Sequence, residues 1–205
     1  MKKIGTIIAL LAGVLLGGQA LAQAPGQSYF GASVGSVWTD GGSPYTINIV
    51  NEDTSVGFKA FAGNMLWNKF GLEVGYYNLG KYETDFTGSG QPFMEAETSA
   101  ISVNGVYTTP LGPGYAFHAK AGLAFTLYEA SCRDAAVCAA SDPVMVNTKN
   151  YGVSGMLGIG ISANLAQDVA LRIDFEHIGS VQGAVGNTNF KDGYDFFSVG
   201  LQFAF

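Results

Sequence analysis

Seven ionisable residues stand in segments where apolar side chains otherwise alternate with small ones. They are Lys59, Glu73, His118, Lys120, Arg172, Asp174 and Glu176. Residues two apart in a strand share one face, so His118 lies beside Lys120, and Asp174 lies between Arg172 and Glu176. Lysine and arginine cations balance the carboxylates in number, and a buried charge without a partner costs several kcal/mol. The pattern predicts an internal network of paired charges with a structural role, outside any catalytic or conducting site.

Two of these charges, Lys59 and Glu73, occur on consecutive expected strands. They are nearly equidistant from the turn that separates the two strands. Directly opposed residues on one face interact across a strand pair. The spacing therefore predicts that Lys59 and Glu73 are cross-strand neighbours.

The segment EHIGS holds His177 and Ser180, whose types could form a nucleophile and its base. Three positions along a continuous strand place these two side chains on opposite faces. The neighbouring Glu176 belongs to the charged face, and no other acidic residue is expected beside His177. We therefore predict an interfacial or loop-base histidine and no catalytic residue.

The segment SCRDAAVC contains both cysteines of the chain, Cys132 and Cys138. An even number of cysteines in an exported protein favours a disulfide. Two thiols without nearby histidines make a poor metal site. The sequence predicts a Cys132 to Cys138 bridge in a long loop, with no metal and no cofactor.

Eight segments with a period of two carry these residues. They cover residues 28–38, 55–63, 70–80, 99–107, 115–128, 151–163, 169–178 and 195–205. The period of two is that of a strand with two different faces. Connections of roughly 15 to 19 residues alternate with connections of about 5 to 7, although compact soluble domains rarely use loops so long. Long loops on one side and short turns on the other are typical of outer-membrane barrels.

Residues 1–22 have the layout of a cleaved signal peptide. Lys2 and Lys3 precede an apolar run over residues 4–16, and Ala20-Leu21-Ala22 supplies the small residues of a cleavage site, with Ala22-Gln23-Ala24 as an alternative. Cleavage would remove two of the 10 basic residues and none of the 16 acidic ones. An acidic chain without clustered Lys and Arg is a poor ligand for nucleic acid. The sequence predicts an exported protein with one domain over residues 23–205.

The direction of the apolar face separates a membrane barrel from a soluble, lipocalin-like barrel with its apolar face inward. A water-facing sheet is normally rich in charge, but the second face here is mostly Gly, Ser and Ala, and only 13% of the chain is charged. Aromatic residues stand near many strand ends, as in interfacial girdles. Members of this set are Trp38, Tyr76, Tyr107, Tyr115, Tyr151, Phe203 and Phe205. The sequence favours an all-β fold, a transmembrane antiparallel eight-stranded up-and-down β-barrel with long extracellular loops and short periplasmic turns.

The segments FGLEVGYYNLG, AKAGLAFT, LRIDFEHIGS and SVGLQFAF resemble the small eight-stranded outer-membrane barrels of the OmpA, OmpX and opacity-protein group. Residues Ser198, Gly200, Phe203 and Phe205 resemble the carboxy-terminal signal of such barrels. This resemblance implies the Gram-negative outer membrane, contact with its lipids and lipopolysaccharide, and assembly by periplasmic chaperones and the barrel-assembly machinery. An interior of eight strands is just wide enough for side chains to fill, so no large open pore is expected.

The function expected from this resemblance is structural or surface-interacting, without enzymatic activity. One alternative is an adhesin or serum-resistance factor that binds host surfaces, or a phage receptor, through its loops. The other is a lipid-A-modifying barrel enzyme. PagL-like deacylases place His and Ser two residues apart, whereas His177 and Ser180 are three apart. A PagP-like acyltransferase would need further loop residues, which the sequence does not place beside His118.

Overall fold

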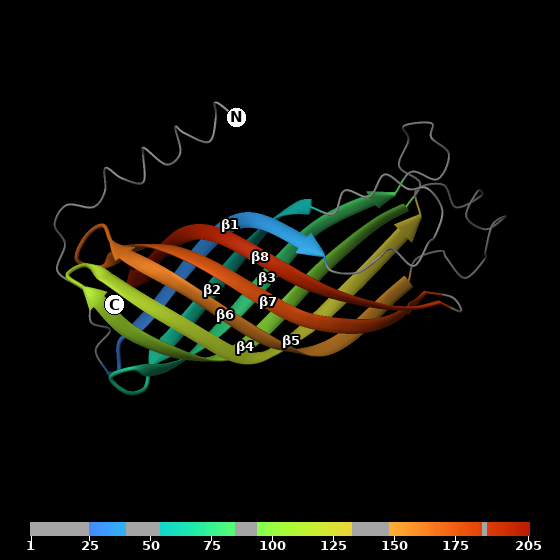
Figure 1. Cartoon of the computed structure of the whole chain (residues 1–205). Helices are drawn as coiled ribbons and strands as arrows, with labels where there is room; N and C mark the ends of the chain where they lie inside the picture. The colour runs from blue at the N-terminus through green and yellow to red at the C-terminus, as the bar shows by residue number, and fades with distance from the viewer. Residues whose placement is uncertain (1–24, 40–53, 85–93, 133–147, 186–187) are drawn as a thin grey trace, which may run out of the picture.

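The computed structural model describes residues 25–39, 54–84, 94–132, 148–185 and 188–205. The predicted signal peptide and Cys138 lie outside these residues. The described residues form eight strands, β1 to β8, each antiparallel to its neighbours, and β1 also pairs with β8. The strands are β1 (Ser28–Thr39), β2 (Thr54–Met65), β3 (Phe70–Thr84), β4 (Met94–Gly112), β5 (Tyr115–Cys132), β6 (Thr148–Asn164), β7 (Val169–Val185) and β8 (Thr188–Ala204). The closed barrel in Figure 1 confirms the predicted fold class.

The described connections are tight turns at 66–69, 113–114 and 165–168, which lie at one end of the barrel together with Phe205 (Figure 1). We call this the turn side and the opposite end the loop side. Within the described part of the chain, no helix is long and apolar enough to cross a membrane.

Several strands extend further toward the loop side than predicted. Strand β8 begins at Thr188, so residues 186–187 alone separate it from β7, where a loop of roughly 15 to 19 residues was expected. The polar residues Gln182 and Lys191 continue this ladder as a register pair. Backbone hydrogen bonds maintain the ladder whether or not the side chains alternate in polarity. The apolar alternation thus covered the middle of the strands but ended before the strands themselves did.

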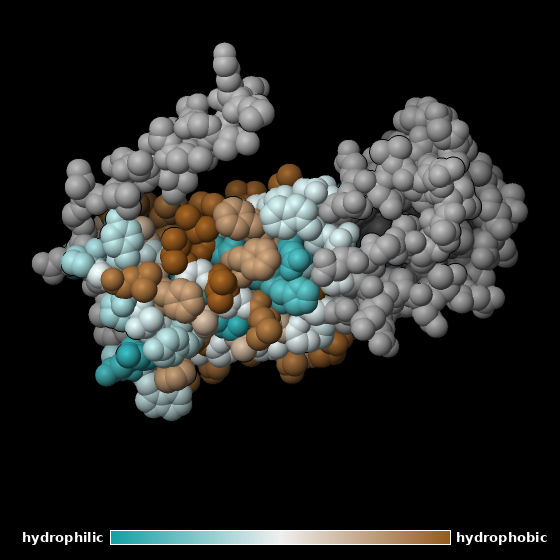
Figure 2. Space-filling view, in the orientation of Figure 1, coloured by the Kyte–Doolittle hydropathy of each residue, from teal (hydrophilic) through white to brown (hydrophobic). Residues whose placement is uncertain are grey.

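Burial follows the predicted period of two. Along β1, Tyr29 and Val37 point inward and are 2% and 0% exposed, whereas Phe30 and Val34 point outward and are 51% and 58% exposed. The same alternation covers the other strands, and hydrophobic side chains spread over the outside of the barrel (Figure 2). The predicted assignment of the two faces, with the apolar face outward, is therefore correct.

The barrel interior has three layers. Tyr29, Phe61 and Met65 form an apolar cluster near the turn side. A second apolar cluster lies toward the loop side and contains Val37, Tyr77, Leu79, Ala100, Ala124, Met156, Ile178, Tyr194 and Phe196. The charged residues of β2, β3, β5 and β7 occupy the space between these clusters. Charged side chains are thereby enclosed by apolar packing on both sides.

Candidate functional site

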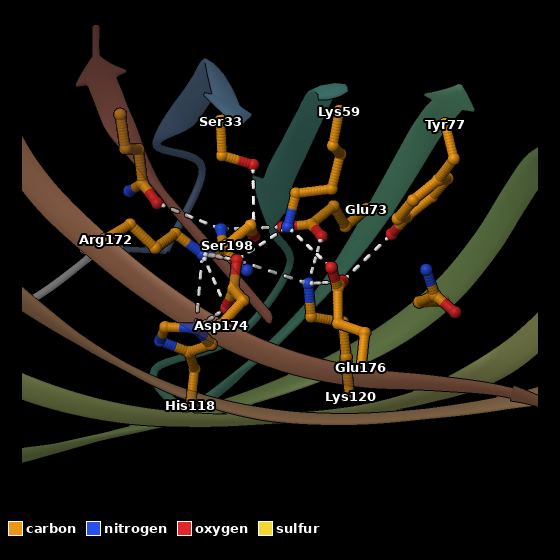
Figure 3. A network of polar contacts seen from close by, with 12 residues as sticks. Ser33, Lys59, Glu73, Tyr77, His118, Lys120, Arg172, Asp174, Glu176 and Ser198 are labelled. Atoms are coloured by element: carbon orange, nitrogen blue, oxygen red, sulfur yellow. Dashed lines mark hydrogen bonds and ion pairs between the residues drawn. The ribbon is translucent and has the colours of Figure 1, made fainter. Parts of the chain in front are cut away.

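Strand β7 supplies the carboxylates at the centre of the charged layer. Asp174 and Glu176 are two positions apart and both point inward. The Lys59 ammonium from β2 donates to Asp174 Oδ2 at 2.6 Å and to Glu176 Oε2 at 2.9 Å. All three side chains are at most 1% exposed. Lys59 thus reaches from β2 across the lumen and bridges the two carboxylates of β7 (Figure 3).

Lys120 and Arg172 connect Glu73 of β3 to the same group (Figure 3). Lys120 Nζ donates to Glu73 Oε1 at 3.0 Å and to Glu176 Oε1 at 2.5 Å. Arg172 Nη1 donates to Glu73 Oε2 at 2.8 Å, and its Nε lies 3.0 Å from Asp174 Oδ2. Each cation therefore bridges two carboxylates, which supplies the compensation that burial of these charges requires.

His118 and Gln202 complete the side of the network nearest Arg172. His118 Nε2 lies 2.5 Å from Asp174 Oδ1 and 3.2 Å from Arg172 Nε. Arg172 Nη1 also donates to Gln202 Oε1 of β8 at 3.1 Å. The seven ionisable residues singled out from the sequence thus lie in one buried cluster.

The pairing expected between Lys59 and Glu73 is wrong. Lys59 is opposite Tyr77, and Glu73 is opposite Gly63. Strand β2 continues to Met65, and the turn is closed by hydrogen bonds from the Leu66 and Trp67 amides to the Phe70 carbonyl. This places the turn nearer to β3 than the alternation indicated. The two charges join the same network through different partners.

Aromatic side chains that were not expected in the network contribute to it. The Tyr29 hydroxyl donates to Glu73 Oε2 at 3.1 Å, and the Tyr77 hydroxyl donates to Glu176 Oε1 at 2.9 Å. The Phe61 ring lies 4.9 Å from Lys59 Nζ and 4.5 Å from Arg172 Cζ. Tyr29, Phe61 and Tyr77 all occupy inward positions of the period of two, so the sequence contained the signal that could have found them.

Gly160 on β6 leaves room for the side chains of His118 and Asp174. A Cβ atom at Gly160 would stand 2.3 Å from His118 Nε2, 2.4 Å from Asp174 Oδ1 and 2.5 Å from the Ile173 carbonyl oxygen. Real Cβ atoms do not approach other atoms so closely. The glycine-rich inward face predicted from the sequence is therefore a packing requirement of the charged layer.

A small cavity of about 20 Å³ adjoins the network on its turn side, and Tyr29, His118, Arg172 and Gln202 are among the residues that line it. A cavity of this size holds about one water molecule. Among the described residues, Arg172 Nη2 is one of the buried polar atoms without a hydrogen-bond partner. The arrangement can hold charges in place, and this cavity is too small for a bound metabolite.

On the outer surface, His177 has a carboxylate partner that was not expected. His177 Nδ1 lies 2.8 Å from Asp195 Oδ1, and the two residues are in register on β7 and β8. The expectation that no acidic residue stands beside His177 is therefore wrong, because the alternation within each strand does not fix the register between β7 and β8. The ladder shifts between Ile178 and Val181, and the side chain of Ser180 lies outside the described residues.

Two further ion pairs lie on the outer face toward the loop side. Lys81 Nζ lies 3.8 Å from Glu97 Oε2, and Lys149 donates to Glu129. Each pair joins residues directly opposed on neighbouring strands. Within the described ranges, no group of three or more His, Cys, Asp or Glu side chains could hold a metal ion.

The carboxy-terminal residues close the barrel. Ser198 is buried, and its hydroxyl lies 3.3 Å from that of Ser33 on β1. A Cβ atom at Gly200 would stand 2.1 Å from the Ala32 carbonyl oxygen. Phe203 stacks on Phe30 with ring centroids 5.3 Å apart, and Phe205 is exposed on the outside. Cys132 ends β5, but its side chain and all of Cys138 lie outside the described residues, so the disulfide stays a prediction.

Comparison with known proteins agrees with this architecture. The profile of the OmpA-like transmembrane domain matches residues 23–205. No match was found among curated protein sequences.

Solved structures share the fold at low sequence identity. OprG of Pseudomonas aeruginosa has a TM-score of 0.62 and 14% identity, over 91% of this chain and 99% of that one. Neisserial surface protein A has a TM-score of 0.59 and 13% identity, over 87% and 98%. Ail, the attachment invasion locus protein of Yersinia pestis, has a TM-score of 0.50 and 12% identity, over 87% and 99%.

Proposed function

Because this chain belongs to the family of OmpA-like transmembrane domains, we propose that it is an outer-membrane protein with a structural or surface-interaction role and no large open pore. The observation that carries the proposal is the filled interior. Charges that are almost fully buried bridge the barrel between two apolar clusters, and the adjoining cavity measures about 20 Å³. The loops then face the exterior, and the turns and the carboxy terminus face the periplasm.

Reconstitution of the purified protein in planar bilayers tests the filled interior. We expect no stable openings of several nanosiemens, because paired charges and packed aromatic rings block the lumen. A porin reconstituted in the same membrane is the positive control. Stable large openings of the wild-type protein would contradict the proposal.

Binding to surfaces through the loops is the second candidate, since two of the similar structures are described as an attachment invasion locus protein and a surface protein. Ail was also solved in complex with a heparin analogue, sucrose octasulfate. Cells that express this protein with 40–53 or 133–147 replaced by short Gly/Ser linkers should lose adhesion to host cells if this role holds. Intact barrels must still reach the membrane, as judged by heat-modifiable gel mobility.

We propose no catalysis for this chain. The one observation that favours an enzyme is the contact between His177 and Asp195 on the outer face. Mass spectrometry of lipid A from cells with and without the gene separates these roles, because a lipid-modifying enzyme changes the mass of the lipid. A mass shift that disappears in His177→Gln or His118→Gln would establish the enzyme instead.

Biogenesis follows the usual route of such barrels in this proposal. The signal peptide is removed after Ala22, periplasmic chaperones deliver the chain, and the assembly machinery reads Ser198, Gly200, Phe203 and Phe205. The mass of the intact, non-reduced protein tests both cleavage and the predicted bridge between Cys132 and Cys138. Free thiols in such material would refute the bridge.

A further inference from the structure

The small cavity on the turn side of the charged layer has a wall that attracts negative charge. His118 and Arg172 of the layer line it, together with the amide of Gln202 and the hydroxyls of Thr108 and Ser162. None of the described residues in this wall carries a carboxylate. The cavity is therefore surrounded by hydrogen-bond donors and by basic groups.

The Gln202 amide is oriented with its NH2 group free to donate into the cavity. Arg172 Nη1 can only donate a hydrogen bond, so the Gln202 atom 3.1 Å from it is the carbonyl oxygen. For Nε2 of Gln202, no described residue supplies an acceptor. Nε2 is not one of the enclosed polar atoms without a partner, so it is accessible from the cavity that its side chain lines.

Asp174 fixes one ring nitrogen of His118 and leaves the other accessible. Nε2 of His118 lies 2.5 Å from Asp174 Oδ1, and an ionised carboxylate can only accept, so Nε2 carries a proton. No described residue contacts Nδ1, and this atom is not enclosed either. Nδ1 is therefore the nitrogen through which His118 can take up a second proton.

Charge balance couples such a proton to an anion. The titratable groups around the ring are Asp174 and Arg172 of β7, Lys120 of β5, and Glu73 of β3 and Tyr29 of β1, which contact each other. The register partners of His118 on β4 and β6 are the uncharged Thr108 and Gly160. With a neutral ring, the three buried cations of the layer balance its three carboxylates. A proton on Nδ1 adds one positive charge, and an unpaired buried charge costs several kcal/mol. An anion in the cavity cancels that charge.

Size and access restrict the ligand to a small ion that arrives from the turn side. The cavity measures about 20 Å³, enough for about one water molecule or one monatomic anion. Thr108 and Ser162 in its wall are partly exposed, whereas His118 and Arg172 in the charged layer are buried. The ion can therefore enter at the turn side, and the packed layer stops it from passing further.

We propose that this cavity binds one small monovalent anion, chloride under cellular conditions, together with one proton on His118 Nδ1. The protonated Nδ1, the Gln202 amide and the hydroxyls of Thr108 and Ser162 donate to the anion, and Arg172 adds positive charge. The proton comes from the same solvent as the anion. The inference goes beyond the proposed function and rests on it in one respect, namely that the turn side faces the periplasm.

The NMR linewidth of chloride in solutions of the full mature protein in an uncharged detergent tests this site. We expect excess broadening, which bromide removes by competition and sulfate, too large for the cavity, does not. The apparent affinity should rise about tenfold when the pH falls by one unit, because one proton binds with each anion. Absence of broadening, or broadening that does not depend on pH, would overturn the proposal.

The variant Gln202→Glu places a carboxylate in the wall of the cavity. Its side chain still offers an oxygen to Arg172 Nη1 but no longer donates, so chloride should bind at least about tenfold more weakly. The matched control is Gln167→Glu, which adds the same charge in the exposed turn at 165–168. Equal weakening by both variants would reveal a general effect of charge and overturn the site.

The variant His118→Gln tests the coupling to a proton. Its amide can still donate to Asp174 but takes up no proton, so the affinity for chloride should change by less than about twofold per pH unit. A slope that stays tenfold in this variant would overturn the role of His118. Gel mobility verifies that each variant forms a closed barrel.

Crystals soaked in bromide at acidic pH locate the ion. We expect an anomalous signal in the cavity beside His118 Nδ1 and Gln202 Nε2. A water molecule in the cavity, with bromide only on the outer surface, would overturn the proposal. A closed barrel that binds no chloride overturns this inference alone, whereas stable openings of several nanosiemens overturn the proposed function.

Discussion

The barrel places ion pairs in two different regions. One is the charged layer of the interior, and the other is an outer row toward the loop side, formed by Lys81, Glu97, Glu129 and Lys149. Inside, Lys59, Glu73 and Glu176 are fully buried, and each cation contacts at least two carboxylates. Outside, Lys81 and Lys149 are more than half exposed, and each forms an ion pair with a carboxylate of the neighbouring strand. The same chemical groups therefore experience very different surroundings.

This difference decides what each region can do. Removal of one partner from a buried pair leaves an uncompensated charge and costs about 3 to 5 kcal/mol, whereas an exposed pair contributes about 0 to 1 kcal/mol. The interior charges cannot leave their partners without a large loss of stability. An outer charge can lose its ion-pair partner with little loss of stability. Burial thus divides the charges into an interior set on which stability depends and an outer set on which it depends little.

The largest expected effect follows from removing a central carboxylate. Asp174→Ala leaves Lys59 and Arg172 with fewer partners in a buried layer. We expect the free energy of unfolding to fall by about 3 to 5 kcal/mol, measured by urea titration in lipid vesicles. A loss below about 1 kcal/mol would mean that water reaches the interior charges, and the two regions would then be alike.

A smaller effect is expected from crowding the same layer without removing a charge. Gly160→Ala brings a methyl group against His118, Asp174 and the backbone of β7. Overpacking of this kind costs about 1 to 3 kcal/mol in free energy of unfolding. Gly155→Ala on the same strand is the matched control, because a Cβ atom there meets nothing within 4 Å. Equal losses in both variants would show that strand propensity, not packing, is the cause.

The adjacent residues Tyr76 and Tyr77 allow the outer face and the interior to be compared by removal of one hydroxyl from each. Tyr77→Phe removes the inward hydroxyl that donates to Glu176, and Tyr76→Phe removes an outward hydroxyl. A hydrogen bond to a charged group contributes about 1.5 to 3 kcal/mol, so the first variant should lower the free energy of unfolding by this amount. We expect a change within about 0.5 kcal/mol for the second. Similar losses in the two variants would contradict the assigned faces.

The smallest effect is expected on the outer row. Glu129→Gln removes the partner of Lys149 but also the repulsion between Glu129 and Glu97. The free energy of unfolding should change by no more than about 0.5 kcal/mol, and the change should shrink further at high salt. Urea titrations at low and high ionic strength measure both quantities. A loss above about 2 kcal/mol would place this row among the structural charges.

The sequence predicted the faces of the strands well because burial in a barrel repeats with a period of two. Lys120 and Arg172 were assigned to the interior from that period alone, and both are buried. The partners of Glu73 could not be read in the same way, since Tyr29, Lys120 and Arg172 reach it across the lumen from other strands. Contacts across a lumen depend on barrel geometry, which no single strand encodes.

Cross-strand partners on the outside depended on register, and register depended on where strands end. His177 meets Asp195 because the register of β7 and β8 places these two residues opposite each other. Lys149 meets Glu129 in the part of β6 that precedes residue 151, where the apolar alternation begins. Polar side chains at the loop side carry no alternation signal, although the backbone ladder continues there. The outer row of Lys81, Glu97, Glu129 and Lys149 was therefore not predicted from the sequence.

Closure of the barrel has a consequence for the order of events during folding. Strand β1 pairs with β2 on one edge and with β8 on the other, and the Ser28 and Phe205 backbones exchange hydrogen bonds at 3.2 and 2.9 Å. The second edge of β1 stays open until nearly the entire chain has been made. Pairing over so large a sequence separation is slow, and an open edge invites aggregation meanwhile. The second edge of β1 is therefore exposed to aggregation until β8 pairs with it.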